Sequence, residues 1–155
     1  MTLDSDKILE IDGQLIPTGR ILDVSERSEF DFRKGKEVGK DIGKCDERIG
    51  GGYDNCFVID DYNPGQLNVA AELSSPKSGR VLRVLTTQPG VQVYTGNWLE
   101  GCPTGKGGRI YHDYDAVAIE CQHFPDSPNK EEYPTTVLRP GEEFHEAIIF
   151  EFSTK

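Results

Sequence analysis

Short apolar stretches with a period of two residues, separated by turns, constrain this sequence most. In residues 67–73 every second side chain is apolar, which is typical of a half-buried strand. Residues 80–87 alternate in the same way after a loop at 74–79. The two runs are therefore expected to pair as an antiparallel hairpin.

Other segments also favour extended structure. Strands are expected at residues 8–11, 53–59, 91–95, 115–122 and 144–152, while residues 16–19 and 140–141 read as turns. Residues 25–43 are expected to form a loop with short extended or helical pieces. No window of useful length shows a 3.6-residue amphipathic period. The sequence predicts an all-β protein, sandwich-like or barrel-like.

Size and charge exclude several classes of partner. The chain has 155 residues, which fits a single domain spanning 1–155, and 27 acidic against 17 basic residues give a net charge of −10. This balance argues against nucleic acid and against an anionic membrane surface. The first residues lack the basic and apolar regions of a signal peptide, so a cytoplasmic location with reduced thiols is expected.

The four cysteines give weak support for a metal site. Cys102, His112, Cys121 and His123 offer thiolate and imidazole ligands, but their spacing matches no known zinc framework. Buried or idle thiols are the expected state, and no metal is predicted.

Three polar residues in strands are candidates for chemistry. Glu120 lies in an apolar stretch, and it would be a general base if its face lines a pocket. Asp54 opens a strand after three glycines and is suited to accept hydrogen bonds from hydroxyl groups. Gln92 shares a face with Tyr94, a pairing that suits sugars. The alternative for all three is an ordinary wet face or turn of an antiparallel sheet.

Six blocks together resemble the aldose 1-epimerase (galactose mutarotase) family. The three longer blocks are Gly52–Phe57, Thr86–Asn97 and Ile119–Asn129, and the shorter ones are Leu15–Gly19, Phe30–Lys34 and Leu138–Glu142. They run in the order and spacing of the family. The resemblance covers the chain from near Ile8 to near Phe152, and it is to the C-terminal half of the family only.

The resemblance implies part of a mostly antiparallel β-sandwich of the galactose mutarotase type, a supersandwich. It implies interconversion of the α and β anomers of free aldohexoses such as glucose or galactose, without metal or organic cofactor. By motif position Glu120 matches the catalytic base, and Asp54 and Gln92 match residues that bind sugar hydroxyls. The family's general acid is a histidine of the other half, and none of the three histidines here stands in that motif.

Half a sandwich would leave sheet edges and apolar faces uncovered. We therefore expect a fragment, one part of a split enzyme, or a chain that associates with itself or with a complementary N-terminal half. A non-catalytic carbohydrate-binding module is the alternative. A relative acting on hexose 6-phosphates would need clustered arginines, and nothing in the sequence gathers Arg80, Arg83 and Arg109 around Glu120.

Overall fold

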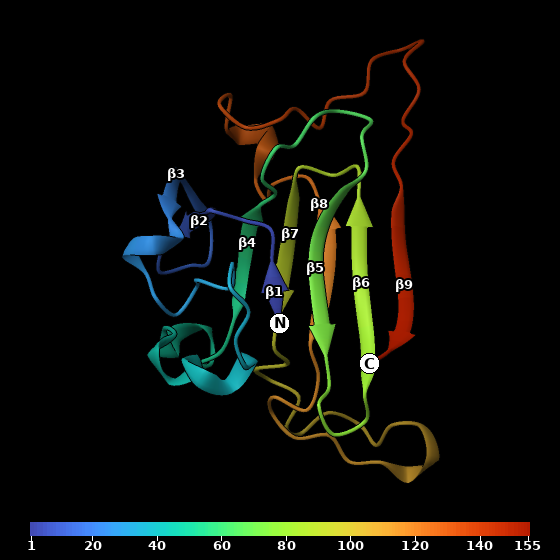
Figure 1. Ribbon diagram of the computed structural model, residues 1–155. Helices are drawn as coiled ribbons and strands as arrows, with labels where there is room; N and C mark the ends of the chain where they lie inside the picture. Colours follow the sequence, from blue (N-terminus) through green and yellow to red (C-terminus); the bar gives the residue numbers. More distant parts are fainter.

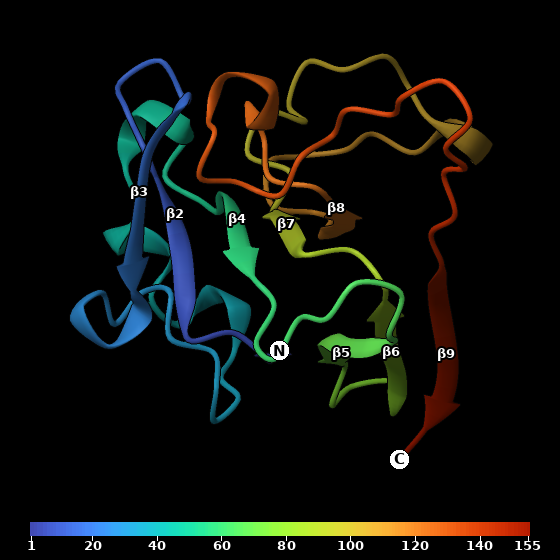
Figure 2. The same ribbon diagram turned by 90° about the horizontal axis from the view of Figure 1, so that it is seen from above.

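Two antiparallel β-sheets face each other in this chain (Figures 1 and 2). The computed structural model describes residues 1–155 except for the side chain of Ile49. The first sheet has the order β1 (Thr2–Leu3), β5 (Asn68–Ser74), β6 (Arg80–Thr86) and β9 (Ile148–Thr154). The second has the order β3 (Pro17–Asp23), β2 (Lys7–Ile11), β4 (Asp54–Val58), β7 (Gly90–Tyr94) and β8 (Ala118–Gln122). The predicted all-β, antiparallel class is confirmed, and so is the β5–β6 hairpin.

Helical structure in the described residues is limited to short 3-10 turns. They are η1 (Val24–Glu26), η2 (Val38–Lys40), η3 (Ile42–Lys44), η4 (Glu47–Ile49), η5 (Lys106–Gly108) and η6 (Ser127–Asn129). The first three lie in or beside the region 25–43, as predicted for it. Among the described residues no helix has the length and apolar character needed to cross a bilayer.

The main core lies between the sheets and is closed on one side by the loop 25–43. Phe57, Val91 and Val93 point into it from β4 and β7 and are fully buried. From the loop, Phe30 and Phe32 pack edge-on against Phe57, with ring centroids 6.3 and 6.4 Å away. One face of β4 and β7 therefore contributes side chains to the core, and the opposite face does not.

A mostly buried lysine fixes the loop 25–43 in place. The Lys36 ammonium lies 4.5 Å from the centroid of the Phe32 ring and donates hydrogen bonds to the carbonyl oxygens of Ser28 and Glu29. It also pairs with Asp41 at 2.9 Å, and hydrogen bonds from Lys36 and Lys44 lower the pKa of Asp41 to about 2. These contacts hold the two loop phenylalanines over the core.

In three places the predicted elements differ from the structure by more than one residue. Residues 17–19 were expected in a turn but belong to β3, an edge strand, where a proline without an N–H group is tolerated. The strand predicted at 115–122 begins only at Ala118, because residues 112–115 form a turn. The backbone N–H of Asp115 closes this turn by donating to the His112 carbonyl oxygen. The last strand begins at Ile148 rather than at Phe144.

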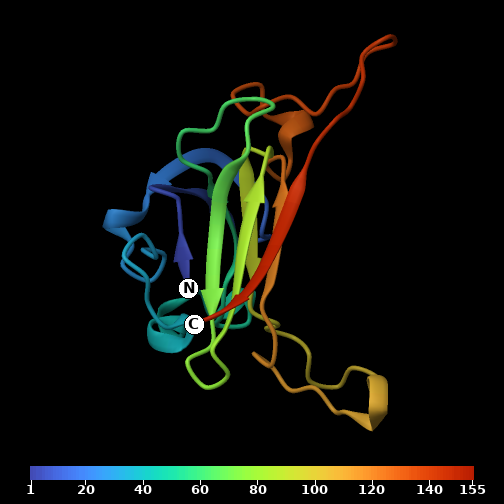
Figure 3. The same ribbon diagram turned by 45° about the vertical axis from the view of Figure 1, so that its right-hand side comes forward.

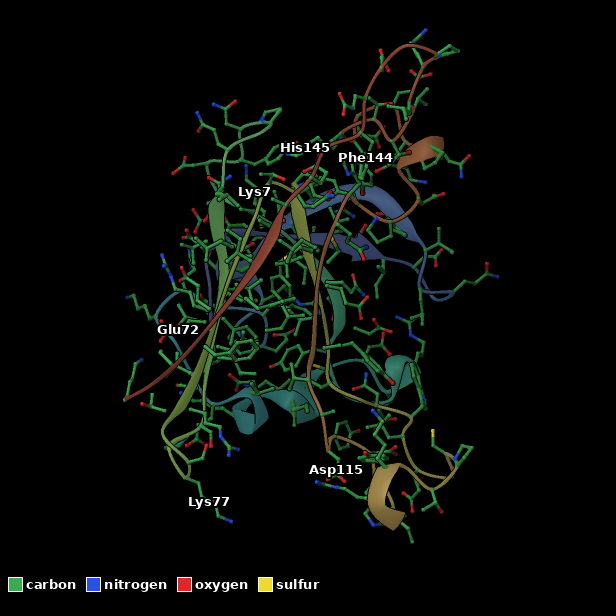
Figure 4. All side chains as sticks on the ribbon, turned by 90° about the vertical axis from the view of Figure 1, so that its right-hand side faces the viewer. Lys7, Glu72, Lys77, Asp115, Phe144 and His145 are labelled. Carbon is green, nitrogen blue, oxygen red and sulfur yellow. The ribbon has the colours of Figure 1, made fainter. Side chains whose placement is uncertain are left out.

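Strand β9 is an uncovered edge of the first sheet. All seven of its residues are exposed, including Phe150 at 50% and Phe152 at 80%. It reaches the sheet through the long segment 123–147, which extends beyond the sandwich in Figures 1 and 3. Figure 4 labels Phe144 and His145 on the part of this segment that leads into β9.

Truncation of a core phenylalanine should be far more costly than truncation of an exposed one. Phe57→Ala removes a fully buried ring and should lower the free energy of unfolding by about 3–5 kcal/mol. Phe144→Ala removes a ring that is 65% exposed and should change it by no more than about 0.5 kcal/mol. Urea unfolding followed by circular dichroism measures both, and equal losses would contradict the described core.

Candidate functional site

The register of three strands brings the predicted polar residues together. Gln92 on β7 lies directly opposite Glu120 on β8, and Asp54 on β4 lies opposite Tyr94 on β7. Directly paired residues and residues two apart point to the same side of a sheet. Asp54, Gln92, Tyr94 and Glu120 therefore share the face that points away from the main core.

Asp54 and Gln92 contact each other directly. The Gln92 side-chain amide donates a hydrogen bond from Nε2 to Asp54 Oδ1 at 2.7 Å. This bond fixes the orientation of the amide, because a carboxylate oxygen can only accept. The other amide atom, Gln92 Oε1, is buried and has no hydrogen-bond partner in the described part of the chain. Its acceptor capacity is therefore unmet, although it has almost no surface in contact with solvent.

A hollow lies over these residues. Its volume is about 370 Å³, within the usual range for small-molecule sites. Its lining residues are Asp54, Gln92, Tyr94, Trp98, Glu120, Gln122 and Pro125. Glu120 is exposed, so its carboxylate is accessible from solvent. The structure thus brings all three predicted site residues to one hollow.

An apolar cluster lies beside the hollow on the same face of the sheet. Cys56 lies opposite Gln92 and packs in a second buried cluster with Leu9, Phe124 and Tyr133. Burial raises the pKa of the Cys56 thiol to about 12. The thiol is therefore protonated at neutral pH, and it is not among the groups that line the hollow.

The structure does not bring together the residues of the two other sites considered from the sequence, a metal site and a cluster of arginines for a sugar phosphate. Among the described residues no group of three or more His, Cys, Asp or Glu side chains is placed to hold a metal ion, so Cys102, His112, Cys121 and His123 do not form one. No arginine and no histidine is among the residues that line the hollow. Arg83 instead pairs with Glu151 at 2.9 Å on the first sheet.

The glycines before Asp54 allow a buried polar network to hold the start of β4. The Tyr53 N–H donates to Thr95 Oγ1 at 2.8 Å, and the Asn97 side-chain amide donates to the Tyr53 carbonyl at 3.1 Å. A Cβ atom at Gly52 would lie 2.2 Å from Asn97 Oδ1 and 2.5 Å from Thr95 Oγ1. A residue without a side chain is therefore required beside this network.

Sequence reasoning missed Trp98 as a lining residue. Trp98 lies beyond the end of β7, so the alternation along the strand does not indicate which way its side chain points. It lies against Gly50, where an added Cβ would approach Trp98 Cε2 to 3.2 Å. Its ring also stacks on Tyr94, with ring centroids 6.4 Å apart. The contact with Gly50 joins residues 48 positions apart, and a local pattern cannot show it.

The chain is similar to known proteins over almost its whole length. The sequence model of the family described as aldose 1-epimerase matches residues 1–151. Human galactose mutarotase is 39% identical over 153 residues, which are 99% of this chain and 43% of that protein. The aldose 1-epimerase of Escherichia coli is 36% identical over 151 residues, 96% of this chain and 43% of that protein. The chain thus spans less than half the length of the curated relatives it matches.

Solved structures agree with this match. The crystal structure of an aldose epimerase homologue from C. elegans has a TM-score of 0.82 and 31% sequence identity, and the match covers 99% of this chain and 45% of that one. The galactose 1-epimerase of Lactobacillus acidophilus has a TM-score of 0.77 and 26% identity, covering 99% and 43%. The fold is therefore part of the galactose mutarotase type of β-sandwich, and the coverage is consistent with one half of that fold.

Gly52→Ala should damage the network that holds β4. The new methyl group would displace the Asn97 and Thr95 side chains, so we expect a loss of about 1–3 kcal/mol in the free energy of unfolding. Gly39→Ala is the matched control, since an added Cβ there meets no atom within 4 Å. Thermal unfolding of both variants checks the prediction, and equal stability of the two would show that the network does not depend on Gly52.

Proposed function

The chain belongs to the aldose 1-epimerase family, and from that premise we propose that it carries the general base and part of the sugar-binding site of an enzyme that interconverts the anomers of free aldohexoses. The convergence of Asp54, Gln92 and Glu120 on one sugar-sized hollow is the observation that carries the proposal. The enzyme class is an isomerase, and glucose and galactose are the proposed substrates. No metal or organic cofactor takes part in the proposed reaction.

Glu120 is proposed as the general base. Its exposed carboxylate at the hollow accepts the proton of the C1 hydroxyl group of the bound pyranose. As that proton leaves, the C1–O5 bond breaks, the ring oxygen takes a proton from an acid, and the free aldehyde forms. Rotation about C1–C2 presents the other face of the carbonyl to the C5 hydroxyl group. Ring closure then reverses the two proton transfers and gives the other anomer.

Asp54 and Gln92 are proposed to bind the sugar hydroxyl groups that do not react. Their mutual hydrogen bond of 2.7 Å orients both side chains before a sugar enters. The Gln92 amide binds one hydroxyl group, and the Asp54 carboxylate accepts a second. Such fixed contacts hold the C1 hydroxyl group near Glu120, which favours proton transfer.

The acid is proposed to come from a complementary segment. The residues that line the hollow include no histidine, whereas the acid of the family is a histidine in the half that this chain does not match. A donor to the ring oxygen would have to enter from the open side of the hollow. The complete activity is therefore proposed for an assembly of this chain with the other half.

Uncovered sheet edges support this assembly. Strands β8 and β9 end the two sheets on the same side of the sandwich, as Figures 1 and 2 show. Each presents unpaired backbone groups at its free edge, which can pair with further strands. The exposed rings of Phe150 and Phe152 add apolar area beside that edge. A complementary half is the proposed partner, and self-association is the alternative.

A non-catalytic carbohydrate-binding module is the second candidate function. It is favoured by one observation, the lack of any histidine among the lining residues of the hollow. Such a module would bind the same sugars through Asp54 and Gln92 without a change of anomer. Mutarotation rates separate the two candidates.

Glu120→Gln should abolish the catalysed reaction. Polarimetry of freshly dissolved α-D-galactose or α-D-glucose measures mutarotation by this chain mixed with the part of a galactose mutarotase that it does not match. We expect the variant to lower the catalysed rate by about 10²–10⁴-fold, because a general base is removed. Glu131→Gln, on a loop outside the hollow, is the control and should be as fast as the unchanged chain.

Two results of this assay would contradict the proposal. If the mixture binds sugar and never accelerates mutarotation, the chain is a non-catalytic binding module. If this chain alone is as fast as the mixture, an external acid is not required.

The uncovered edges also predict the native mass. Light scattering of the purified chain should give a mass above the 17.3 kDa of one copy, either through self-association or through a co-purified partner. Phe150→Ser together with Phe152→Ser should lower that mass, since both exposed rings are removed. A stable, compact species of 17.3 kDa at high concentration would show that the edges need no cover.

A further inference from the structure

We propose that Thr95 and Asn97 are positioning residues of the hollow. Their side chains close a ring of hydrogen bonds on the backbone of Tyr53, which fixes the next residue, Asp54, before a sugar enters. The inference rests on the proposed function, in which Asp54 binds a sugar hydroxyl group. Thr95 and Asn97 act through the backbone, since neither is among the residues that line the hollow.

Asp54 stands where the backbone has little local support. It is the first residue of β4, and three glycines, residues 50–52, come shortly before it. Gly50 and Gly51 have φ angles of +80° and +70°. Glycine has the greatest conformational freedom of all residues, and the ends of elements open more readily than their centres. Contacts beyond the β4 ladder are therefore needed to keep Asp54 in place.

A closed ring of hydrogen bonds supplies these contacts at Tyr53. The Tyr53 N–H group donates to Thr95 Oγ1 at 2.8 Å. The Thr95 hydroxyl group donates to Asn97 Oδ1 at 2.6 Å, and Asn97 Nδ2 donates to the Tyr53 carbonyl oxygen at 3.1 Å. Both polar groups of the Tyr53 backbone are thus bound by side chains 42 and 44 positions away.

The ring is buried. Thr95 is 2% exposed and Asn97 is 1% exposed. A buried donor or acceptor that loses its partner cannot turn to water instead, so the loss is costly. Removal of one member would leave the other groups of the ring without partners. The ring therefore holds the backbone as a unit.

The side chain of Tyr53 sets the direction of Asp54. Tyr53 is fully buried, its ring centroid lies 5.3 Å from that of Phe32, and its hydroxyl group donates to the Glu29 carbonyl oxygen at 2.8 Å. Successive side chains of an extended chain point to opposite faces. Because Tyr53 is held in the main core, Asp54 is turned to the hollow, where it accepts the hydrogen bond of 2.7 Å from Gln92.

A sugar that enters the hollow then meets an acceptor already in position. Such order before binding reduces the entropy lost when the complex forms. Glu120 lies on β8, which is separated from β4 by β7. We therefore expect the ring to affect the affinity for the sugar more than the proton transfer at Glu120.

Removal of one hydroxyl group tests the ring. Thr95→Val keeps the shape of the side chain and removes its hydrogen bonds, whereas Thr95→Ser keeps the hydroxyl group. Thr86→Val is the matched control on β6 of the other sheet. Thr86 is fully buried, and its hydroxyl group donates to the Ala147 carbonyl oxygen and accepts from the Gln88 N–H group. Both valine variants should lower the urea midpoint of unfolding.

The first readout needs no sugar. In NMR spectra of the chain, Thr95→Val should move the Gln92 side-chain amide signal toward that of a free amide and speed its exchange with water. Thr95→Ser and Thr86→Val should leave this signal unchanged. Asn97→Ala opens the ring at its other side chain and should act as Thr95→Val does, which keeps the test decisive if one variant does not fold. An unchanged Gln92 signal would overturn the proposal.

The second readout is sugar affinity by calorimetry. The ligand is 1,5-anhydrogalactitol, a pyranose that lacks the C1 hydroxyl group and cannot change its anomer. Thr95→Val should weaken its binding about tenfold, while Thr95→Ser and Thr86→Val should bind it as the unchanged chain does. Equal weakening in Thr95→Val and Thr86→Val would reflect lost stability alone and would overturn the positioning role.

Failure of this inference is distinguishable from failure of the proposed function. If the Gln92 signal depends on Thr95 but the unchanged chain binds no sugar, the proposed sugar site is wrong and the ring still positions Asp54. If Glu120→Gln abolishes mutarotation while Thr95→Val alters neither the Gln92 signal nor the affinity, the proposed function stands and the positioning role fails.

Discussion

Pairing of β7 with β4 on one side and with β8 on the other is the constraint on which both the core and the site depend. It sets Gln92 opposite Glu120 and places Asp54 within 2.7 Å of the Gln92 amide. The same strands send Val91 and Val93 into the core from their other face. A shift of one residue in the pairing of β7 would move its core-facing side chains to the opposite face of the sheet. Burial of the valines and assembly of the hollow therefore require the same register.

This arrangement gives a site that is organised on one side and open on the other. The Asp54 and Gln92 side chains are fixed by their mutual hydrogen bond, and Gly50 and Gly52 leave room for Trp98 and for the network that holds β4. Opposite them lies solvent rather than protein. The free edges of β8 and β9 also end on one side of the sandwich. The open hollow and the uncovered sheet edges both belong to a chain that spans less than half the length of its relatives.

Local patterns predicted what depends on neighbours in sequence. The alternation of residues 67–73 and 80–87 gave the β5–β6 hairpin, and the alternation in β7 correctly separated Gln92 and Tyr94 from the buried valines. For Glu120 the pattern allowed either a solvent-exposed face of the sheet or a pocket. In the structure Glu120 is exposed and also lines the hollow, so both descriptions apply. The family resemblance, rather than the alternation, identified the three site residues as a group.

Contacts between distant residues were beyond these patterns. The place of Trp98 depends on Gly50 as well as on the nearby Tyr94, and the late start of the last strand depends on the path of segment 123–147. The most direct test of the account is a crystal structure of the chain soaked with galactose. We expect a pyranose in the hollow, with its C1 hydroxyl group within hydrogen-bond distance of the Glu120 carboxylate. Its other hydroxyl groups should form hydrogen bonds with Asp54 and Gln92. A sugar bound elsewhere, or one whose C1 hydroxyl group points away from Glu120, would contradict it.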